Sequence, residues 1–234
     1  MDEQKAKNAS MAPPRLLLLE TSHQPGFVAL AEGETLLGVR RLDEARRHAR
    51  DLAPAVGELL SAQGWKPRDV QTVVVGRGPG SYTGLRVGIM SAKAFAYATG
   101  CTLLGLETFA VIAAQAPPDA IRLAVLADAQ QDKVYVQEFE HNLPVAPLRI
   151  TSFNDWLHAA TKPLWVSGPG LRKWAAHLAA NMKPLEPQLW EPQPETMLRL
   201  GLARQEKGER DAVWSMEPIY LRPSAAEEQW AKRG

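Results

Sequence analysis

Hydrophobic residues along the 234-residue chain fall into short runs separated by glycine and proline, a pattern that predicts an α/β protein. The run Val70–Val75 contains three consecutive valines and is typical of a strand buried on both faces. It leads through a glycine-rich stretch into a helical pattern, Leu85–Thr99, which stops at Gly100. We therefore expect a strand–turn–helix unit around which the remaining elements are arranged.

The segments around this unit complete a first half of type βββαβαβ. Apolar runs and turn residues predict strands at 15–20, 27–31, 35–41 and 102–106, and a largely helical segment at 43–63. The two strands at 27–31 and 35–41 are joined at Glu32-Gly33-Glu34 and form a meander.

The second half repeats this order. An apolar strand at 123–127 ends at Asp128 and is followed by a polar turn and a strand at 133–140. Further on, a short strand at 164–167 leads into Gly168-Pro169-Gly170, which repeats Gly78-Pro79-Gly80. Helices are expected at 153–160, 171–180 and 195–207. This repeat predicts a duplicated α/β unit and not a solenoid, which would need a shorter period and more copies.

Four segments follow from this pattern. Prolines cluster around 116–119, which we take as the boundary between two lobes. The predicted division is a disordered extension at 1–14, a first lobe at 15–116, a second lobe at 117–223 and a flexible tail at 224–234.

Composition narrows the class of protein. The formal net charge is +1, so nothing marks a dedicated nucleic-acid binder or a membrane-surface protein. The single Cys101 excludes an internal disulfide and suits a reducing compartment. No apolar stretch approaches the length that spans a membrane. We expect a cytoplasmic protein.

A strand that feeds a glycine-rich turn and then a helix can hold an anion, because backbone N–H groups and the helix dipole point at it. Gly78, Gly80 and Ser81 are the candidates for such a phosphate loop, and a purely structural turn is equally consistent with the glycines. The spacing excludes three known loops. No lysine follows for a P-loop, Thr83 stands where a Rossmann fingerprint needs glycine, and Pro79 stands where a nucleophile elbow needs one.

The duplicated plan resembles the actin-like ATPase and sugar-kinase superfamily, in which two similar ribonuclease-H-like lobes surround a nucleotide. That resemblance assigns Glu20 and Asp128 to the acid positions at the first strand of each lobe, with Thr21 and Ser22 beside Glu20. Acids at such strand ends can hold Mg²⁺ through water. Both could equally be turn residues, Asp128 capping its own turn and Glu20 solvated, and for Glu20 we favour the solvated turn residue.

Several motifs together resemble the TsaB (YeaZ) family of bacterial threonylcarbamoyladenosine biosynthesis, over about residues 15–223. The glycine stretch from Gly78 to Gly88 is the specific signature. Supporting motifs are Leu19-Glu20-Thr21-Ser22, Asp128-Ala129 before Val134-Tyr135, and Pro218-Ile219-Tyr220-Leu221-Arg222. Two features depart from the family pattern: Glu20 replaces an aspartate, and Gln130-Gln131-Asp132 stands where Arg-Arg-Gly is common.

The resemblance implies a non-catalytic scaffold that activates a partner. TsaB proteins pair with TsaD, a related metal-bearing subunit that transfers the threonylcarbamoyl group onto an adenosine of transfer RNA. The partners implied are a TsaD-like transferase, a TsaE-like ATPase, transfer RNA through the complex and, for the chain alone, a homodimer, with no membrane. No cofactor is expected to bind tightly, and ATP or ADP with Mg²⁺ is expected to bind weakly in the complex.

The resemblance also gives a test for metal. TsaD holds its metal with two histidines spaced i, i+4 on one helix face. Here the matching helix has His48, but Leu52 stands at i+4, so no metal site is expected. The basic residues around His48 could meet RNA phosphates, although an exposed helix face balanced by acids is the interpretation we favour.

The partner surface is predicted on two helices, as the resemblance implies. Small residues recur at i, i+4 on the helix after the glycine turn and would let another helix approach closely; these are Gly84, Gly88, Ala92 and Ala96. The helix at 43–63 would add the apolar residues Leu52, Val56 and Leu59. Packing of the small residues against the chain's own sheet is the alternative.

Two other functions compete with the scaffold. An independent ATP-dependent phosphotransferase of the same fold is opposed by Glu20, by the altered turn at Gln130-Gln131 and by a chain short for a full substrate domain. A metalloprotease is opposed by the missing histidine pair.

Overall fold

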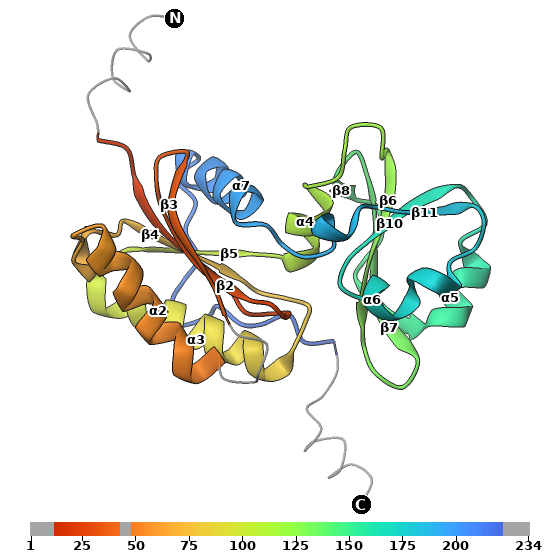
Figure 1. The fold of residues 1–234 in the computed structure, drawn as a ribbon, viewed down its shortest axis with the longest axis horizontal. Coiled ribbons are helices and arrows are strands. Elements are labelled where there is room, and N and C mark those ends of the chain that lie inside the picture. Colours follow the sequence, from red (N-terminus) through yellow and green to blue (C-terminus); the bar gives the residue numbers. More distant parts are fainter. Residues whose placement is uncertain (1–11, 43–47, 222–234) are drawn as a thin grey trace, which may run out of the picture.

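A computed structural model describes residues 12–42 and 48–221, which form two α/β lobes (Figure 1). The first lobe contains a five-stranded sheet in the order β3-β2-β1-β4-β5. Its strands are β1 (Arg15–Glu20), β2 (Phe27–Glu32), β3 (Thr35–Arg41), β4 (Thr72–Gly76) and β5 (Thr102–Leu106). The strands β1, β4 and β5 run parallel, while β1–β2 and β2–β3 are antiparallel.

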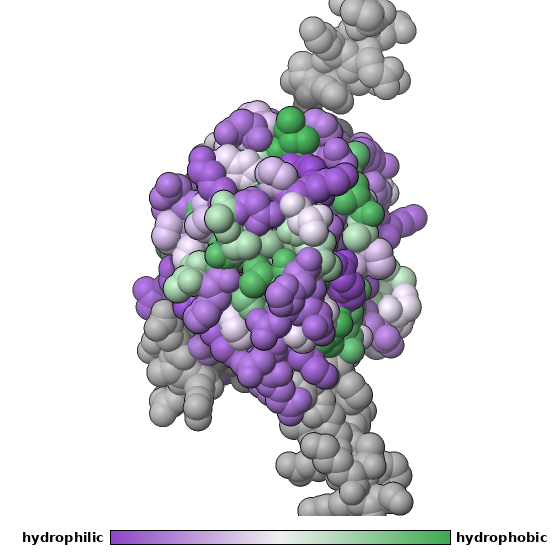
Figure 2. All heavy atoms as spheres, turned by 90° about the vertical axis from the view of Figure 1, so that its right-hand side faces the viewer, coloured by the Kyte–Doolittle hydropathy of each residue, from purple (hydrophilic) through white to green (hydrophobic). Residues whose placement is uncertain are grey.

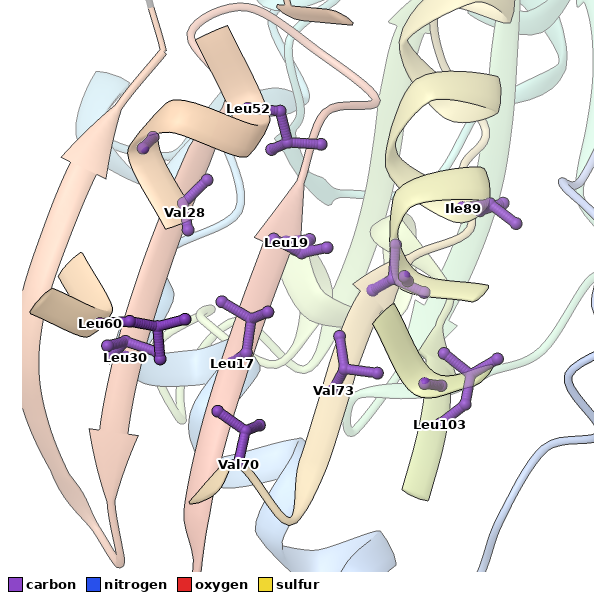
Figure 3. Close-up of a cluster of buried hydrophobic side chains, with 14 of the residues drawn as sticks. Leu17, Leu19, Val28, Leu30, Leu52, Leu60, Val70, Val73, Ile89 and Leu103 are labelled. Carbon is purple, nitrogen blue, oxygen red and sulfur yellow. The ribbon is translucent and has the colours of Figure 1, made fainter. Parts of the chain in front are cut away.

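Helices cover both faces of this sheet, which explains the uninterrupted leucine run of β1. Side chains alternate along a strand, so Leu17 and Leu19 point to one face and Leu16 and Leu18 to the other. The helices α2 (His48–Ala62) and α3 (Tyr82–Thr99) cover the first face, where Figure 3 shows Leu17, Leu19 and Ile89 in one buried cluster. The second face is covered by α7 (Pro194–Glu206).

The second lobe repeats this topology around β6 (Arg122–Asp128). β6 pairs antiparallel with β7 (Lys133–Glu140) and parallel with β10 (Leu164–Ser167), as β1 does with β2 and β4. The remaining strands are β8 (Leu143–Pro144), β9 (Arg149–Ser152) and β11 (Met182–Pro184), and the helices are α5 (Phe153–Ala159) and α6 (Leu171–Trp174). The duplication predicted from the sequence is confirmed. The outer face of this lobe is largely hydrophilic around a central hydrophobic patch (Figure 2).

Several predicted boundaries were wrong. α3 begins at Tyr82, three residues earlier than expected, because Ser81 caps it with a side-chain hydrogen bond from Gly84 N. The helix expected at 171–180 is the short α6 followed by a 3₁₀ turn at Ala175–His177. The helix α4 (Thr108–Ala113) and the strand β11 were missed. The expected start of the helix at 43–63 lies partly outside the described residues.

The second lobe is shorter than the predicted 117–223, because the chain returns to the first lobe after residue 193. In α7, Met197 and Leu198 pack against Leu16 and Leu18 in one buried cluster. Residues 211–221, which we call the C-terminal strap, follow α7 and also lie on the first lobe, where Asp211 N donates to Leu103 O at 2.8 Å. The first lobe therefore consists of two separate parts of the sequence.

Two other predictions concern the described residues only in part. The expected extension at 1–14 overlaps them at residues 12–14, and the tail at 224–234 lies outside them. Within the described part of the chain, no helix has the length and apolar character needed to cross a membrane.

Candidate functional site

Each Gly-Pro-Gly segment joins a strand to a helix, as predicted. Gly78 lies between β4 and α3, and Gly168 lies between β10 and α6. Gly78 has φ +97° and Gly168 has φ +106°, which is a backbone conformation that a side chain rarely allows. The glycine at the first position of each turn is therefore required by the backbone itself.

The first turn packs directly against the end of β1. Ser81 N donates to Ser22 O at 2.7 Å, and Thr21 Oγ1 donates to Gly84 O at 2.8 Å. A Cβ on Gly80 would collide with Ser22 O, and one on Gly84 would collide with Thr21 O. These glycines permit close contact with the chain's own backbone.

The backbone N–H groups of this turn are also used within the chain. Gly78 N donates to Thr108 Oγ1 at 3.2 Å, Gly84 N donates to Ser81 Oγ at 3.2 Å, and the Ser81 N–H is bonded as described above. An anion site at a helix N-terminus needs such groups free to point at the ligand. The intrachain bonds of Gly78 N and Ser81 N fit a structural turn, and a phosphate site at Gly78, Gly80 and Ser81 stays a prediction.

Glu20 is buried, which corrects the expectation of a solvated side chain. Only 2% of the residue is exposed, and its Oε1 accepts a hydrogen bond from Ser22 N at 2.6 Å. Gly76 makes the space for it, because a Cβ there would collide with the carboxylate. Burial raises the pKa of Glu20, although hydrogen bonds from Ser22 and Thr108 oppose that rise.

Asp128 holds the matching position at the end of β6 but lies in a different environment. Its side chain is 43% exposed and accepts a hydrogen bond from Gln130 N at 3.1 Å, so it caps its own turn. Lys173 Nζ lies 3.8 Å from its carboxylate. The structure therefore gives Glu20 and Asp128 unlike surroundings, one buried and one open to solvent.

Glu191, which the sequence did not single out, lies in the segment that returns from the second lobe. Its side chain is 9% exposed and lies 3.1 Å from the guanidinium of Arg172 on α6. Burial raises the pKa of Glu191 to about 7; Arg172 opposes the rise and the charge of Glu20 adds to it. No sequence signal marked this residue, because it stands alone in a proline-rich stretch.

His23 follows Ser22 in the turn after β1. Its Nε2 atom is buried and has no hydrogen-bond partner among the described residues. Burial lowers the pKa of His23 to about 4; a hydrogen bond with the Pro79 backbone opposes the decrease, and the charge of Arg172 contributes to it. The imidazole is therefore neutral at pH 7.

The predicted partner stripe on α3 does not face solvent, and this prediction was wrong. Gly84, Gly88, Ala92 and Ala96 are all buried against the chain's own sheet. A Cβ on Gly88 would collide with Thr21 Oγ1. The small residues let α3 approach β1 closely, which is the alternative considered from the sequence.

The apolar residues predicted on α2 face the same core. Leu52 is 2% exposed, and Val56 and Leu59 are partly buried against the same cluster. The outward faces of the two helices carry other residues. On α3 these include Met90 and Tyr97, which are 61% and 72% exposed, and on α2 they include Ala53, Gly57 and Ser61.

No group of three or more His, Cys, Asp or Glu side chains gathers at one metal-binding point within the described residues. The side chain of His48 lies outside the described part of the chain. The expectation that no metal is held tightly therefore stays a prediction.

Comparisons with known proteins show which families this chain resembles. The family model described as "TsaD: tRNA N6-adenosine threonylcarbamoyltransferase" matches residues 37–150, which include α2 and α3. The chain is 26% identical to the tRNA threonylcarbamoyladenosine biosynthesis protein TsaB of Escherichia coli, covering 93% of this chain and 97% of that protein. It is also 26% identical to TsaB of Bacillus subtilis, covering 92% and 97% of the two chains.

Two solved structures of YeaZ or a YeaZ-like protein are also similar to this chain. YeaZ from Pseudomonas aeruginosa superposes with a TM-score of 0.73 at 25% identity, covering 89% of this chain and 100% of that one. A second Pseudomonas aeruginosa structure, described as similar to peptidase YEAZ, has a TM-score of 0.75 at 27% identity and the same coverage. Together with the duplicated topology, these matches confirm the predicted α/β fold with two similar lobes. Over nearly its whole length the chain is thus similar to proteins of the TsaB (YeaZ) family.

Proposed function

We propose that this protein is a non-catalytic subunit in the formation of N6-threonylcarbamoyladenosine on transfer RNA, and that it acts by pairing with a TsaD-like transferase. The observation that carries the proposal is the likeness to TsaB proteins over more than nine tenths of the chain. The TsaD family model extends over residues 37–150, so the two subunits would share one helix arrangement.

The geometry of the first turn supports a non-catalytic role. A phosphotransferase of this fold needs backbone N–H groups and an accessible acid around the nucleotide phosphates. Here Gly78 and Ser81 donate their N–H groups within the chain, and Glu20 is enclosed. The described residues therefore favour the scaffold over an independent phosphotransferase.

The pairing surface would be the outward face of α2 and α3. Both helices lie within the segment matched to TsaD, so a TsaD-like partner would present a similar helix pair. Small outward residues on α2, such as Ala53 and Gly57, permit close approach of a second helix. Met90 and Tyr97 on α3 supply exposed apolar area beside them.

The same proposal covers the remaining partners and cofactors. A TsaE-like ATPase and transfer RNA would meet this chain in the complex, and the chain alone would form a homodimer through the same helix face. No cofactor would be bound tightly, and ATP or ADP with Mg²⁺ would bind weakly and only in the complex.

Reconstitution tests this function. The purified chain, the TsaD-like protein of the same cell, the TsaE-like ATPase, ATP with Mg²⁺, a threonylcarbamoyl donor and unmodified transfer RNA are combined, and modified nucleoside is measured by mass spectrometry. We expect product in the full mixture and background levels when this chain is omitted. The chain alone with ATP and Mg²⁺ should release no phosphate. Full modification without this chain, or phosphate release by it alone, would contradict the proposal.

A further inference from the structure

The C-terminal strap runs beside α3 and is held to the first lobe by several hydrogen bonds. Lys93 Nζ donates to Trp214 O and to Met216 O, both at 3.2 Å. Further along, Arg77 Nε donates to Glu217 O at 3.2 Å, and Ile219 N donates to Arg77 O at 2.9 Å. The strap is therefore a fixed part of the first lobe's surface.

Two strap residues that are close in the sequence, Met216 and Trp214, differ sharply in exposure to solvent. Met216 is 4% exposed and belongs to the buried cluster beneath α3. Trp214 is 77% exposed, although Lys93 holds its backbone carbonyl in place. Tryptophan carries a large apolar surface, and an exposed indole is typical of protein–protein contact surfaces.

The aromatic rings of the strap pack against aromatic rings of α3. Trp214 meets Tyr97 edge to face with ring centroids 5.4 Å apart, and Tyr220 stacks on Tyr82 at 4.7 Å. Arg86 lies over the Tyr82 ring at 4.3 Å, and its Nε donates to the Tyr220 hydroxyl at 3.3 Å. Side chains already held in place lose little conformational entropy on binding, which favours affinity.

A cavity of about 500 Å³ opens between the strap and α3. Its walls include the apolar residues Ile89, Met90 and Met216, and its charged lining residues are Arg86, Lys93 and Glu217. A pocket beside tryptophan, tyrosine and arginine has the composition of the energetic centre of a protein–protein interface.

We propose that the strap forms the anchoring half of the partner surface, with Trp214 and the Tyr97 ring that packs on it as anchors and the cavity receiving one apolar side chain of the TsaD-like partner. This inference rests on the proposed function. The occupant is an apolar helix face of that partner edged by acidic side chains, because the strap lies beside the exposed Met90 and Tyr97 of α3 and two of the three charged residues lining the cavity are basic. Lys93 acts as a positioning residue, since it holds the strap by its backbone carbonyls.

Binding measurements on the full chain test the proposal. The dissociation constant for the TsaD-like protein of the same cell is measured by titration calorimetry for wild type, Trp214→Ala, Tyr97→Ala and Leu143→Ala. Loss of an interface anchor weakens binding about 30-fold or more. We expect that loss for Trp214→Ala and Tyr97→Ala. Leu143 is 69% exposed in the second lobe, so Leu143→Ala is the matched control and should change the constant less than about twofold.

Lys93 is tested separately. Lys93→Ala should weaken binding and free the strap, which is seen as faster hydrogen exchange of strap amides, whereas Lys93→Arg should restore part of both. A residue that only contributed charge to the partner would leave the exchange of the strap amides unchanged.

The outcomes separate the inference from the proposed function. If wild type binds and both aromatic variants bind equally well while folded by circular dichroism, the strap is not the anchor and this inference fails. If wild type does not bind, the proposed function fails. If the variants lose only self-association in light scattering, the surface serves a second copy of this chain, and the partner assignment is overturned.

Discussion

The two lobes share one topology and one Gly-Pro-Gly turn, but the turn serves different purposes in each. In the first lobe it opens the 18-residue helix α3, and Gly80 lies against the Ser22 backbone. In the second lobe it opens the four-residue helix α6, and Gly170 has more room. The acids at the ends of β1 and β6 also differ in burial, since Glu20 is enclosed and Asp128 is exposed. The backbone scaffold is the same in both lobes, but the close contact with backbone falls on Gly80 in the first turn and on Gly168 in the second.

The largest expected difference between the lobes is at the third residue of each turn. Gly80→Ala places a Cβ against Ser22 O, which belongs to the backbone and cannot move aside. The Cβ of Gly170→Ala lies 3.1 Å from Leu126 O and needs only a small shift. We expect the free energy of unfolding to fall by about 3 kcal/mol for Gly80→Ala and about 1 kcal/mol for Gly170→Ala. Urea denaturation of both variants measures this, and equal losses would mean that the two turns are packed alike.

The next prediction concerns Glu191, where the two lobes meet the returning chain. Its pKa is raised to about 7 in the folded state from 4.5, so the folded protein binds a proton more tightly than the unfolded chain. Stability is therefore lost as pH rises through 7, by about 2 kcal/mol between pH 5 and pH 7. Glu191→Gln removes that part of the pH dependence. Melting temperatures across this range check it, and identical pH profiles for variant and wild type would contradict the assignment.

The two strand-end acids are expected to differ from each other. The folded-state pKa of Glu20 is raised, so its contribution to stability is also lost as pH rises above its unfolded value. Glu20→Gln should flatten the dependence of stability on pH. Asp128→Asn should leave stability within about 0.5 kcal/mol of wild type, because the residue is exposed. Chemical denaturation at pH 5 and pH 8 measures the free energy of unfolding of both variants. If that free energy changed with pH in the same way for both, the acids of the two lobes would not differ.

The sequence predicted the repeat well because strand periodicity and turn glycines are local signals. The valine run before Gly78 and the apolar run before Gly168 each gave a strand and a turn in the correct place. The same signals could not tell which way α3 faces. Gly88 and Ala92 permit close approach of any backbone, whether the chain's own β1 or a partner's helix, and only the fold decides between them.

The burial of Glu20 could not be predicted for a different reason. Space for its carboxylate comes from Gly76, and its hydrogen-bond partner Thr108 is 88 residues away. The exposed Trp214 was likewise unrecognised, because its position depends on Lys93 on another element. Such sites are made by contacts between distant segments, and composition or spacing along the chain carries no trace of them.

The return of α7 and the strap to the first lobe has a consequence for how the protein is made. Translation delivers residues 12–116 first, yet the sheet face bearing Leu16 and Leu18 stays uncovered until Met197 and Leu198 have been synthesised. The whole second lobe must emerge from the ribosome in between. A chain cut short before α7 leaves apolar surface open to chaperones and proteases, and it also lacks the strap. Trp214 can lie beside Tyr97 only after the second lobe and α7 have been synthesised.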